Sequence, residues 1–82
     1  MNKYIVHFQR SPIMNVSPDI LRLEQQRMSD LMRDQILINL KMSKQMDNIW
    51  LEIQTRSKEE LMDIIKTLPM CKNLYFEVYD II

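Results

Sequence analysis

The chain has 82 residues, of which 46% are apolar, and its 11 Lys and Arg residues balance its 11 Asp and Glu residues. This length predicts a single domain spanning residues 1–82, and this composition is typical of a folded chain. The zero net charge argues against nucleic-acid binding, which needs concentrated positive charge against the phosphates. The chain has no glycine, which excludes a Gly-rich phosphate loop and a Gly-x-Ser-x-Gly nucleophile elbow.

The cysteine and methionine content argues against a disulfide and against a metal site. Cys71 is the only cysteine, so no intramolecular disulfide or cysteine-based zinc cluster can form, and a reducing, cytoplasmic location is expected. The eight methionines form no clustered motif and are interpreted as core-filling residues. No apolar run approaches the roughly 20 residues that cross a bilayer. The start of the chain alternates polar and apolar residues, unlike a signal peptide, so we expect no membrane contact.

The first half of the chain predicts a strand, a loop and a helix. Residues 3–10 alternate in polarity and are rich in β-branched and aromatic types, which predicts a strand. Residues 11–16 predict a loop. Ser17 and Pro18 are typical of a helix start, and apolar residues at helical spacing continue to about Asp34. The predicted apolar stripe of this helix consists of Ile20, Leu21, Met28, Leu31 and Met32.

The second half predicts a hairpin, a second helix and a last strand. Residues 36–42 and 49–55 both alternate with a period of two, and a short polar segment joins them, as in a β-hairpin. Ser57 and Glu60 form a capping box that opens a helix. Residues 74–81 predict the final strand.

The resulting order β-α-β-β-α-β predicts a ferredoxin-like α+β fold. With right-handed crossovers, this order gives a four-stranded antiparallel sheet that carries two helices on one face. Other domains share the same order of elements, so the order alone does not identify a function.

Alternating strand residues point to opposite faces of a sheet, so the pattern assigns each residue to a face. The helix-covered face is expected to carry Tyr4, Val6, Phe8, Ile36, Ile38, Leu40, Met42, Ile49, Leu51, Ile53, Leu74, Phe76 and Val78. The open face is expected to carry Ile5, His7, Leu37, Asn39, Lys41, Trp50, Glu52, Gln54, Tyr75, Glu77 and Tyr79.

The open face mixes residue types that suit neither water nor a dry core. Trp50, Tyr75 and Tyr79 give it more apolar surface than a solvated face usually exposes. Lys41 and Glu52, in contrast, need polar partners if they are buried. A second sheet that faces this one across a partly polar cavity would accommodate both groups. We therefore expect a homodimer or a higher homo-oligomer.

The segment WLEIQTRSKEELMDIIKTLPMCKNLYFEV, residues 50–78, resembles the C-terminal half of muconolactone isomerase and its relatives. The shared pattern is a strand, a Ser-capped acidic helix start, a Leu-Pro helix exit and a last strand with an aromatic-x-Glu-Val sequence. The resemblance implies a dimeric α+β barrel, and a proton shift on an unsaturated lactone that needs no metal or cofactor. Residues 34–41 differ from the Trp- and Arg-containing segment of the isomerase, so the resemblance assigns no catalytic residue.

The candidate catalytic residues on the open face are His7, Glu52 and Glu77. An imidazole can take up and release a proton near neutral pH, and two carboxylates in a half-dry cavity can differ in proton affinity. A salt bridge to Lys41 or simple exposure is the plainer interpretation of the glutamates. The candidate ligand-binding residues are Asn39, Lys41, Trp50 and Tyr75, of which the two aromatic residues are also suited to burial against a partner subunit.

Two functions remain open. The first is a small-molecule-binding protein or cofactor-free isomerase that acts on a small organic ligand in an inter-subunit cavity. The second is a non-catalytic homo-oligomeric module, structural or regulatory, whose paired sheets are filled by side chains. An RNA-recognition-type domain is disfavoured because Glu52 and Glu77 lie where such a domain needs a basic surface.

Overall fold

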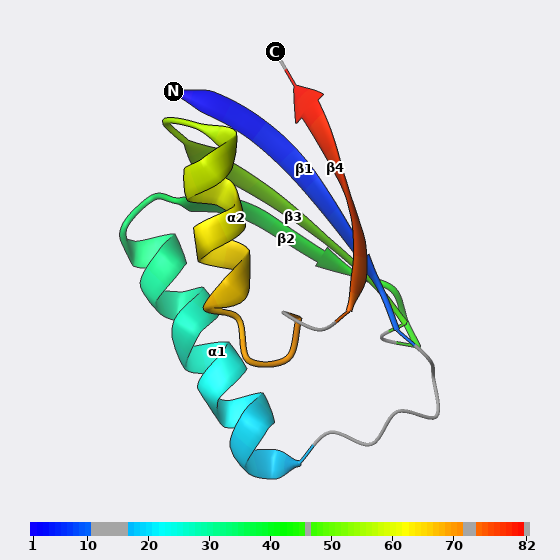
Figure 1. The fold of residues 1–82 in the computed structure, drawn as a ribbon. Coiled ribbons are helices and arrows are strands. Elements are labelled where there is room, and N and C mark those ends of the chain that lie inside the picture. Colours follow the sequence, from blue (N-terminus) through cyan, green and yellow to red (C-terminus); the bar gives the residue numbers. More distant parts are fainter. Residues whose placement is uncertain (11–16, 46, 72–73, 82) are drawn as a thin grey trace.

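The four strands form one antiparallel sheet in the order β2-β3-β1-β4, and both helices cover the same face of it (Figure 1). The computed structural model describes residues 1–10, 17–45, 47–71 and 74–81. The elements in chain order are β1 (Asn2–Gln9), α1 (Pro18–Arg33), β2 (Leu37–Met42), β3 (Asn48–Thr55), α2 (Lys58–Lys66) and β4 (Tyr75–Ile81). The predicted ferredoxin-like α+β fold is confirmed. The loop predicted over residues 11–16 lies outside the described residues.

Both helices begin at the predicted serines. The Ser17 hydroxyl accepts a hydrogen bond from the Ile20 N–H at 3.2 Å, and the Ser57 hydroxyl accepts one from the Glu60 N–H at the same distance. The Glu60 carboxylate accepts from the Arg56 N–H at 3.3 Å rather than from Ser57 itself, so the predicted capping box is shifted by one residue. These bonds satisfy N–H groups that have no partner within the first turn of a helix.

The chain leaves α1 without the glycine that often ends a helix. Gln35 takes the left-handed backbone conformation instead, with a φ of 60°. Its neighbour Ile36 donates its N–H to the Leu31 carbonyl at 2.9 Å and so continues directly into β2.

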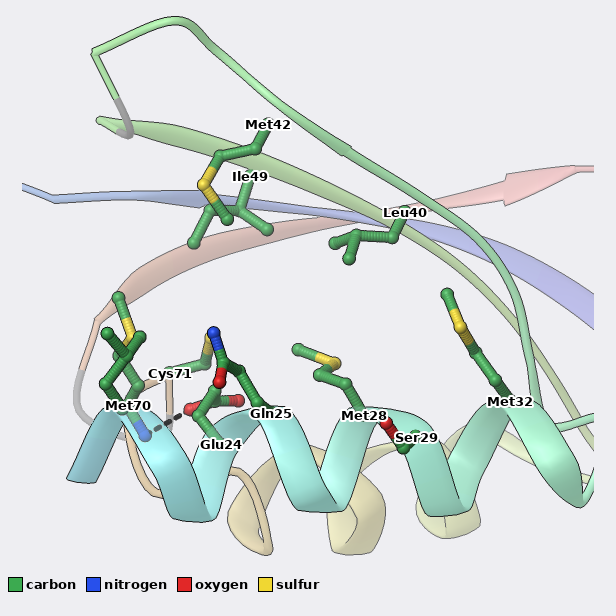
Figure 2. Close-up of a pocket in the computed structure, with 11 residues that line it drawn as sticks. Glu24, Gln25, Met28, Ser29, Met32, Leu40, Met42, Ile49, Met70 and Cys71 are labelled. Atoms are coloured by element: carbon green, nitrogen blue, oxygen red, sulfur yellow. Dashed lines mark hydrogen bonds between the residues drawn. The ribbon is translucent and has the colours of Figure 1, made fainter. Parts of the chain in front are cut away.

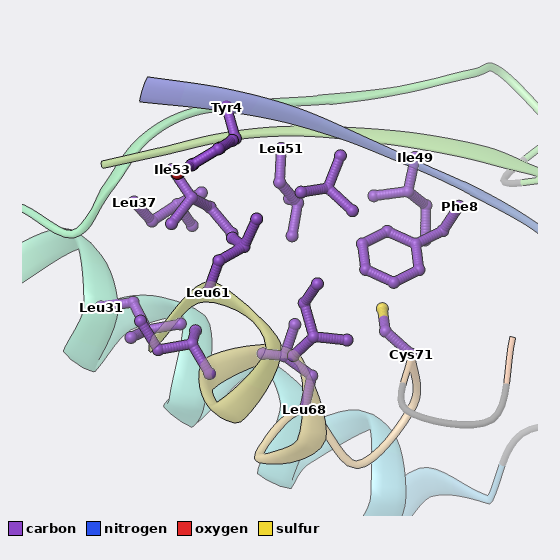
Figure 3. Close-up of a cluster of buried hydrophobic side chains, with 13 residues drawn as sticks. Tyr4, Phe8, Leu31, Leu37, Ile49, Leu51, Ile53, Leu61, Leu68 and Cys71 are labelled. Atoms are coloured by element: carbon purple, nitrogen blue, oxygen red, sulfur yellow. The ribbon is translucent and has the colours of Figure 1, made fainter. Parts of the chain in front are cut away.

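The core lies between the sheet and α2 (Figure 3). The predicted inward residues of β1 and β3 are buried, and Phe8, Leu51 and Ile53 are fully so. From α2 and the turn that follows it, the core receives Leu61, Ile64, Ile65 and Leu68. The apolar faces that the sequence pattern predicts for β1, β3 and α2 therefore pack against each other.

The predicted faces of β2 are wrong at its first residues. Leu37 pairs with Ile53 and Asn39 pairs with Glu52, so Ile38 is the extra residue of a β-bulge. Leu37 is consequently buried, with 3% of its surface exposed, whereas Ile38 is 43% exposed. The alternation resumes after the bulge, and Asn39 and Lys41 lie on the open face as predicted.

The predicted apolar stripe of α1 is only partly in the core. Leu31 is buried and Met28 packs against the core, but Ile20 and Met32 are exposed. The buried residue in the middle of this helix is Glu24. The helix therefore does not lie flat on the sheet in the way that a continuous apolar stripe predicts.

Candidate functional site

The strand register aligns the candidate residues in rows across the open sheet face. One row contains Lys41, Trp50, His7 and Glu77, from β2, β3, β1 and β4 respectively. The neighbouring row contains Asn39, Glu52, Ile5 and Tyr79 in the same strand order. Directly paired residues in such rows have Cβ atoms about 5 Å apart. The alternation in sequence thus correctly predicts that these side chains share one face.

His7 and Trp50 form the centre of the first row. Their rings are stacked, with centroids 5.0 Å apart and planes 3° from parallel. His7 Nε2 lies 2.8 Å from Asn48 Oδ1. Because an amide oxygen only accepts, this bond places the proton of a neutral His7 on Nε2 and leaves Nδ1 as an acceptor. The stack and the hydrogen bond together hold the imidazole in one orientation.

The two candidate glutamates have different surroundings. Glu77 accepts a hydrogen bond from the Tyr79 hydroxyl, and this bond raises the pKa of Tyr79. The side chain of Glu52 makes no hydrogen bond or ion pair with another described residue. The same holds for Lys41 among those residues, so the salt bridge considered for the glutamates does not form. His7 is directly opposite Glu77 and diagonal to Glu52, and it is hydrogen-bonded to neither.

A hollow of about 320 Å³ lies beside this row, over β2, β3 and β1. It is lined by Ile5, Asn39, Lys41, Trp50, Leu51 and Glu52. The structure thus brings together the predicted ligand-binding residues Asn39, Lys41 and Trp50 with the predicted catalytic residue Glu52. His7 borders this group through its stack on Trp50.

The remaining candidates lie apart from the hollow. Glu77 is on β4, three strands away from Lys41. Tyr75 pairs with Gln9 near the beginning of β4, and 66% of its surface is exposed. Neither lines the hollow.

The sequence pattern did not predict the roles of Asn48 and Glu24. Asn48 begins β3, and its side chain orients His7. Glu24 is a buried charged-type residue of α1, with 5% of its surface exposed. A signal for Glu24 was present, because it lies three and four residues from the apolar residues Leu21 and Met28, on the same side of the helix.

Other kinds of site find little support in the described parts of the chain. They contain no group of three or more His, Cys, Asp and Glu residues that could hold a metal ion. Neither helix there is long and apolar enough to span a membrane. Burial raises the pKa of Cys71 to about 12, so its thiol is not ionised at neutral pH and is a poor nucleophile.

Comparison of the chain with protein-family models and with curated proteins finds no match. The ferredoxin-like fold therefore follows from the chain's own strand order and register. Because this fold carries many unrelated activities, a function has to be argued from the hollow and the side chains around it.

Proposed function

We propose that this protein is a homo-oligomer that binds a small organic ligand between the open sheet faces of two subunits. The observation that carries the proposal is the hollow on the open face, where Lys41 and Glu52 lie beside Trp50 without an ion pair to any described residue. The proposal agrees with the dimeric α+β barrel that the resemblance to the muconolactone isomerase family implies.

The aromatic residues of the open face support pairing of two sheets. Trp50, Tyr75 and Tyr79 are 38%, 66% and 49% exposed in the single chain. Three large aromatic side chains exposed on one sheet face are unusual for a monomeric protein, and Trp and Tyr are favoured in interfaces. A second sheet over this face would bury the aromatic rings and enclose the hollow.

The groups around the hollow favour a flat ligand with an acidic group. The Trp50 ring offers a stacking surface, and the Lys41 ammonium can pair with a carboxylate. The Glu52 carboxylate accepts hydrogen bonds and would select a hydroxyl or N–H group elsewhere on the ligand. The ligand class proposed is therefore a small planar organic acid that also carries a hydrogen-bond donor.

Cofactor-free isomerisation is the second candidate function, and Glu52 is the residue that favours it. It is the carboxylate of the hollow and has no hydrogen-bond partner among the described residues. His7 Nε2 and the Glu77 carboxylate are both already engaged. In this candidate function Glu52 takes a proton from one carbon of the ligand and returns it to another, Lys41 stabilises the negative charge that develops in between, and His7 positions the Trp50 ring.

The test uses Trp50 as a reporter, because it is the only tryptophan. Light scattering at micromolar concentration should give a dimer or larger species. The change Ile5→Arg, which places a charge in the middle of the open face, should yield a monomer and shift the Trp50 emission to longer wavelength. Leu23→Arg is the matched control, because Leu23 is 54% exposed on α1, in the layer on the other side of the sheet. A monomeric wild-type protein would refute the proposal.

Ligand binding is tested on the single indole N–H resonance of Trp50. Benzoate, a planar acid, should shift this resonance more strongly than benzyl alcohol, its uncharged counterpart. Lys41→Ala should abolish the preference, whereas Lys58→Ala on α2 should not. A dimer that shows no preference for the acid would instead favour the non-catalytic module.

A further inference from the structure

A second cavity lies on the other side of the sheet, between α1 and the strands β2 and β3. Its volume is about 350 Å³ (Figure 2). Methionines from three parts of the chain line it: Met28 and Met32 from α1, Met42 from β2, and Met70 from the segment after α2. Leu40 and Ile49 form its wall on the sheet, and Figure 2 shows Met28 and Met32 pointing toward that wall. Methionine side chains adapt to ligands of different shape, so this wall suits an apolar guest.

Three polar residues line this cavity, Glu24, Gln25 and Ser29, and the buried one among them is Glu24. One of its oxygens, Oε2, accepts a hydrogen bond from the Met70 N–H (Figure 2). The other, Oε1, is buried and makes no hydrogen bond of normal geometry with any described residue. Buried polar atoms are nearly always paired, and an unpaired one costs free energy. Oε1 therefore has no donor in good hydrogen-bonding geometry, although Cys71 lies close enough to influence the Glu24 carboxylate.

The charges around Glu24 do not compensate its burial. No described Lys or Arg forms an ion pair with it. Arg10 reaches the cavity region through Met70, with Nη1 3.9 Å from Met70 Sδ. Burial raises the pKa of Glu24, and hydrogen bonding by Met70 and by Cys71 lowers it only in part. A guest with a hydrogen-bond donor would satisfy Oε1 and stabilise the carboxylate.

We infer that this cavity binds an apolar molecule whose single polar head donates a hydrogen bond to Oε1 of Glu24, that is, an apolar amine or alcohol. The apolar part of the guest lies against the methionines and Leu40, where it is removed from water. A guest with a carboxylate head is disfavoured, because its charge repels that of Glu24 and it offers no donor. This site is independent of the proposed function, since it lies on the helix-covered side of the sheet.

The experiment follows the methionine methyl resonances during titration with three guests of equal chain length: n-hexylamine, n-hexanol and hexanoate. At pH 8, the amine and the alcohol should shift the methyl signals of Met28, Met32, Met42 and Met70 saturably. The signals of Met1 and Met62, which do not line the cavity, serve as internal controls. Hexanoate should bind at least tenfold more weakly. Equal binding of all three guests, or no saturable shift with the amine or the alcohol, would overturn the inference.

Variants of Glu24 test the role of its carboxyl group directly. Glu24→Leu removes the acceptor and should abolish the preference for amine and alcohol over hexanoate. Glu24→Gln keeps an acceptor, so it should retain alcohol binding while losing at least tenfold in affinity for the amine. Glu59→Gln, at an exposed position in the first turn of α2, is the matched control with the same loss of charge.

Two further readouts guard against misfolding and against binding elsewhere. Met42→Phe narrows the cavity from the edge strand without touching Glu24, and it should weaken the binding of all three guests. Lys41→Ala changes the open face, so it should bind hexylamine and hexanol as tightly as the wild type does. The Trp50 indole N–H signal also reports on the open face, and it should not shift when either guest is added. A shift of the Trp50 signal that saturates together with the methyl signals would overturn the assignment to this cavity.

Discussion

The two helices cover the same face of the sheet but pack against it differently. The nine-residue helix α2 and the turn after it bury Leu61, Ile64, Ile65 and Leu68. The sixteen-residue helix α1 buries only Leu31 and Glu24, and it leaves Ile20 and Leu23 exposed. The short helix thus completes the core, whereas the long helix stands over a cavity. Tight packing and open space are consequently found in different parts of one layer of helices.

The largest effect that tests this comparison is expected in the core beneath α2. Leu61 is fully buried, so Leu61→Ala should lower the free energy of unfolding by about 3 kcal/mol. Met28→Ala on α1 should lower it by only about 1 kcal/mol, because Met28 is partly buried and already borders the cavity. Urea denaturation followed by circular dichroism measures both values. Equal losses would contradict the division between the two helices.

The β-bulge in β2 turns Leu37 toward the core, at the end of the sheet where α1 contributes Leu31. Leu37 packs in the core with Leu31, near the end of α1, whereas its neighbour Ile38 is exposed. Leu37→Ala should lower the free energy of unfolding by about 2 kcal/mol, while Ile38→Ala should change it by no more than about 0.5 kcal/mol. A regular alternation without a bulge would bury Ile38 and expose Leu37, so Ile38→Ala would then cause the larger loss of free energy of unfolding. Denaturation of the two variants therefore tests the register of β2 directly.

The smallest expected effect is a dependence of stability on pH that comes from Glu24. Burial raises its pKa above the ordinary 4.5 in the folded protein, so the folded state holds a proton that the unfolded chain has released. The stabilisation that comes from this extra bound proton is fully present below pH 4.5. It is lost as the pH rises through the raised pKa of Glu24 in the folded protein. Glu24→Gln has no such loss, so its stability relative to wild type should increase with pH and then level off.

The measurement for Glu24 is urea denaturation of the wild type and the variant over a series of pH values. Glu59→Gln serves as the control for loss of a negative charge at an exposed site of α2. A stability difference between Glu24→Gln and wild type that is constant across the series would show that burial does not alter the proton affinity of Glu24.

Much of the candidate site on the open face could be predicted from the sequence, because it depends on alternation along strands. His7, Trp50, Lys41 and Glu77 share a face in every register that keeps the apolar residues inside. Which of them are neighbours could not be predicted. That depends on the order of the strands as well as on their register: β4 lies three strands from β2, so Glu52 of β3, rather than Glu77, shares the hollow with Lys41.

The burial of Glu24 also could not be predicted from the local sequence pattern. Its spacing places it on the inner side of α1, but a carboxyl group at that position suggests the solvated side. Its burial depends on Met70 and Cys71, which follow α2 in the sequence and meet α1 only in the folded chain.

The sequence by itself determined the six elements, the serines that begin both helices and the faces of β1 and β3. These depend on interactions between residues a few positions apart, which are the same in any fold that the chain could adopt. The tertiary structure decided the bulge at Ile38, the pairing around Trp50 and the burial of Glu24. Each of these results from contacts between segments distant in sequence, whose relative shift is set by how the whole layer of helices packs against the sheet.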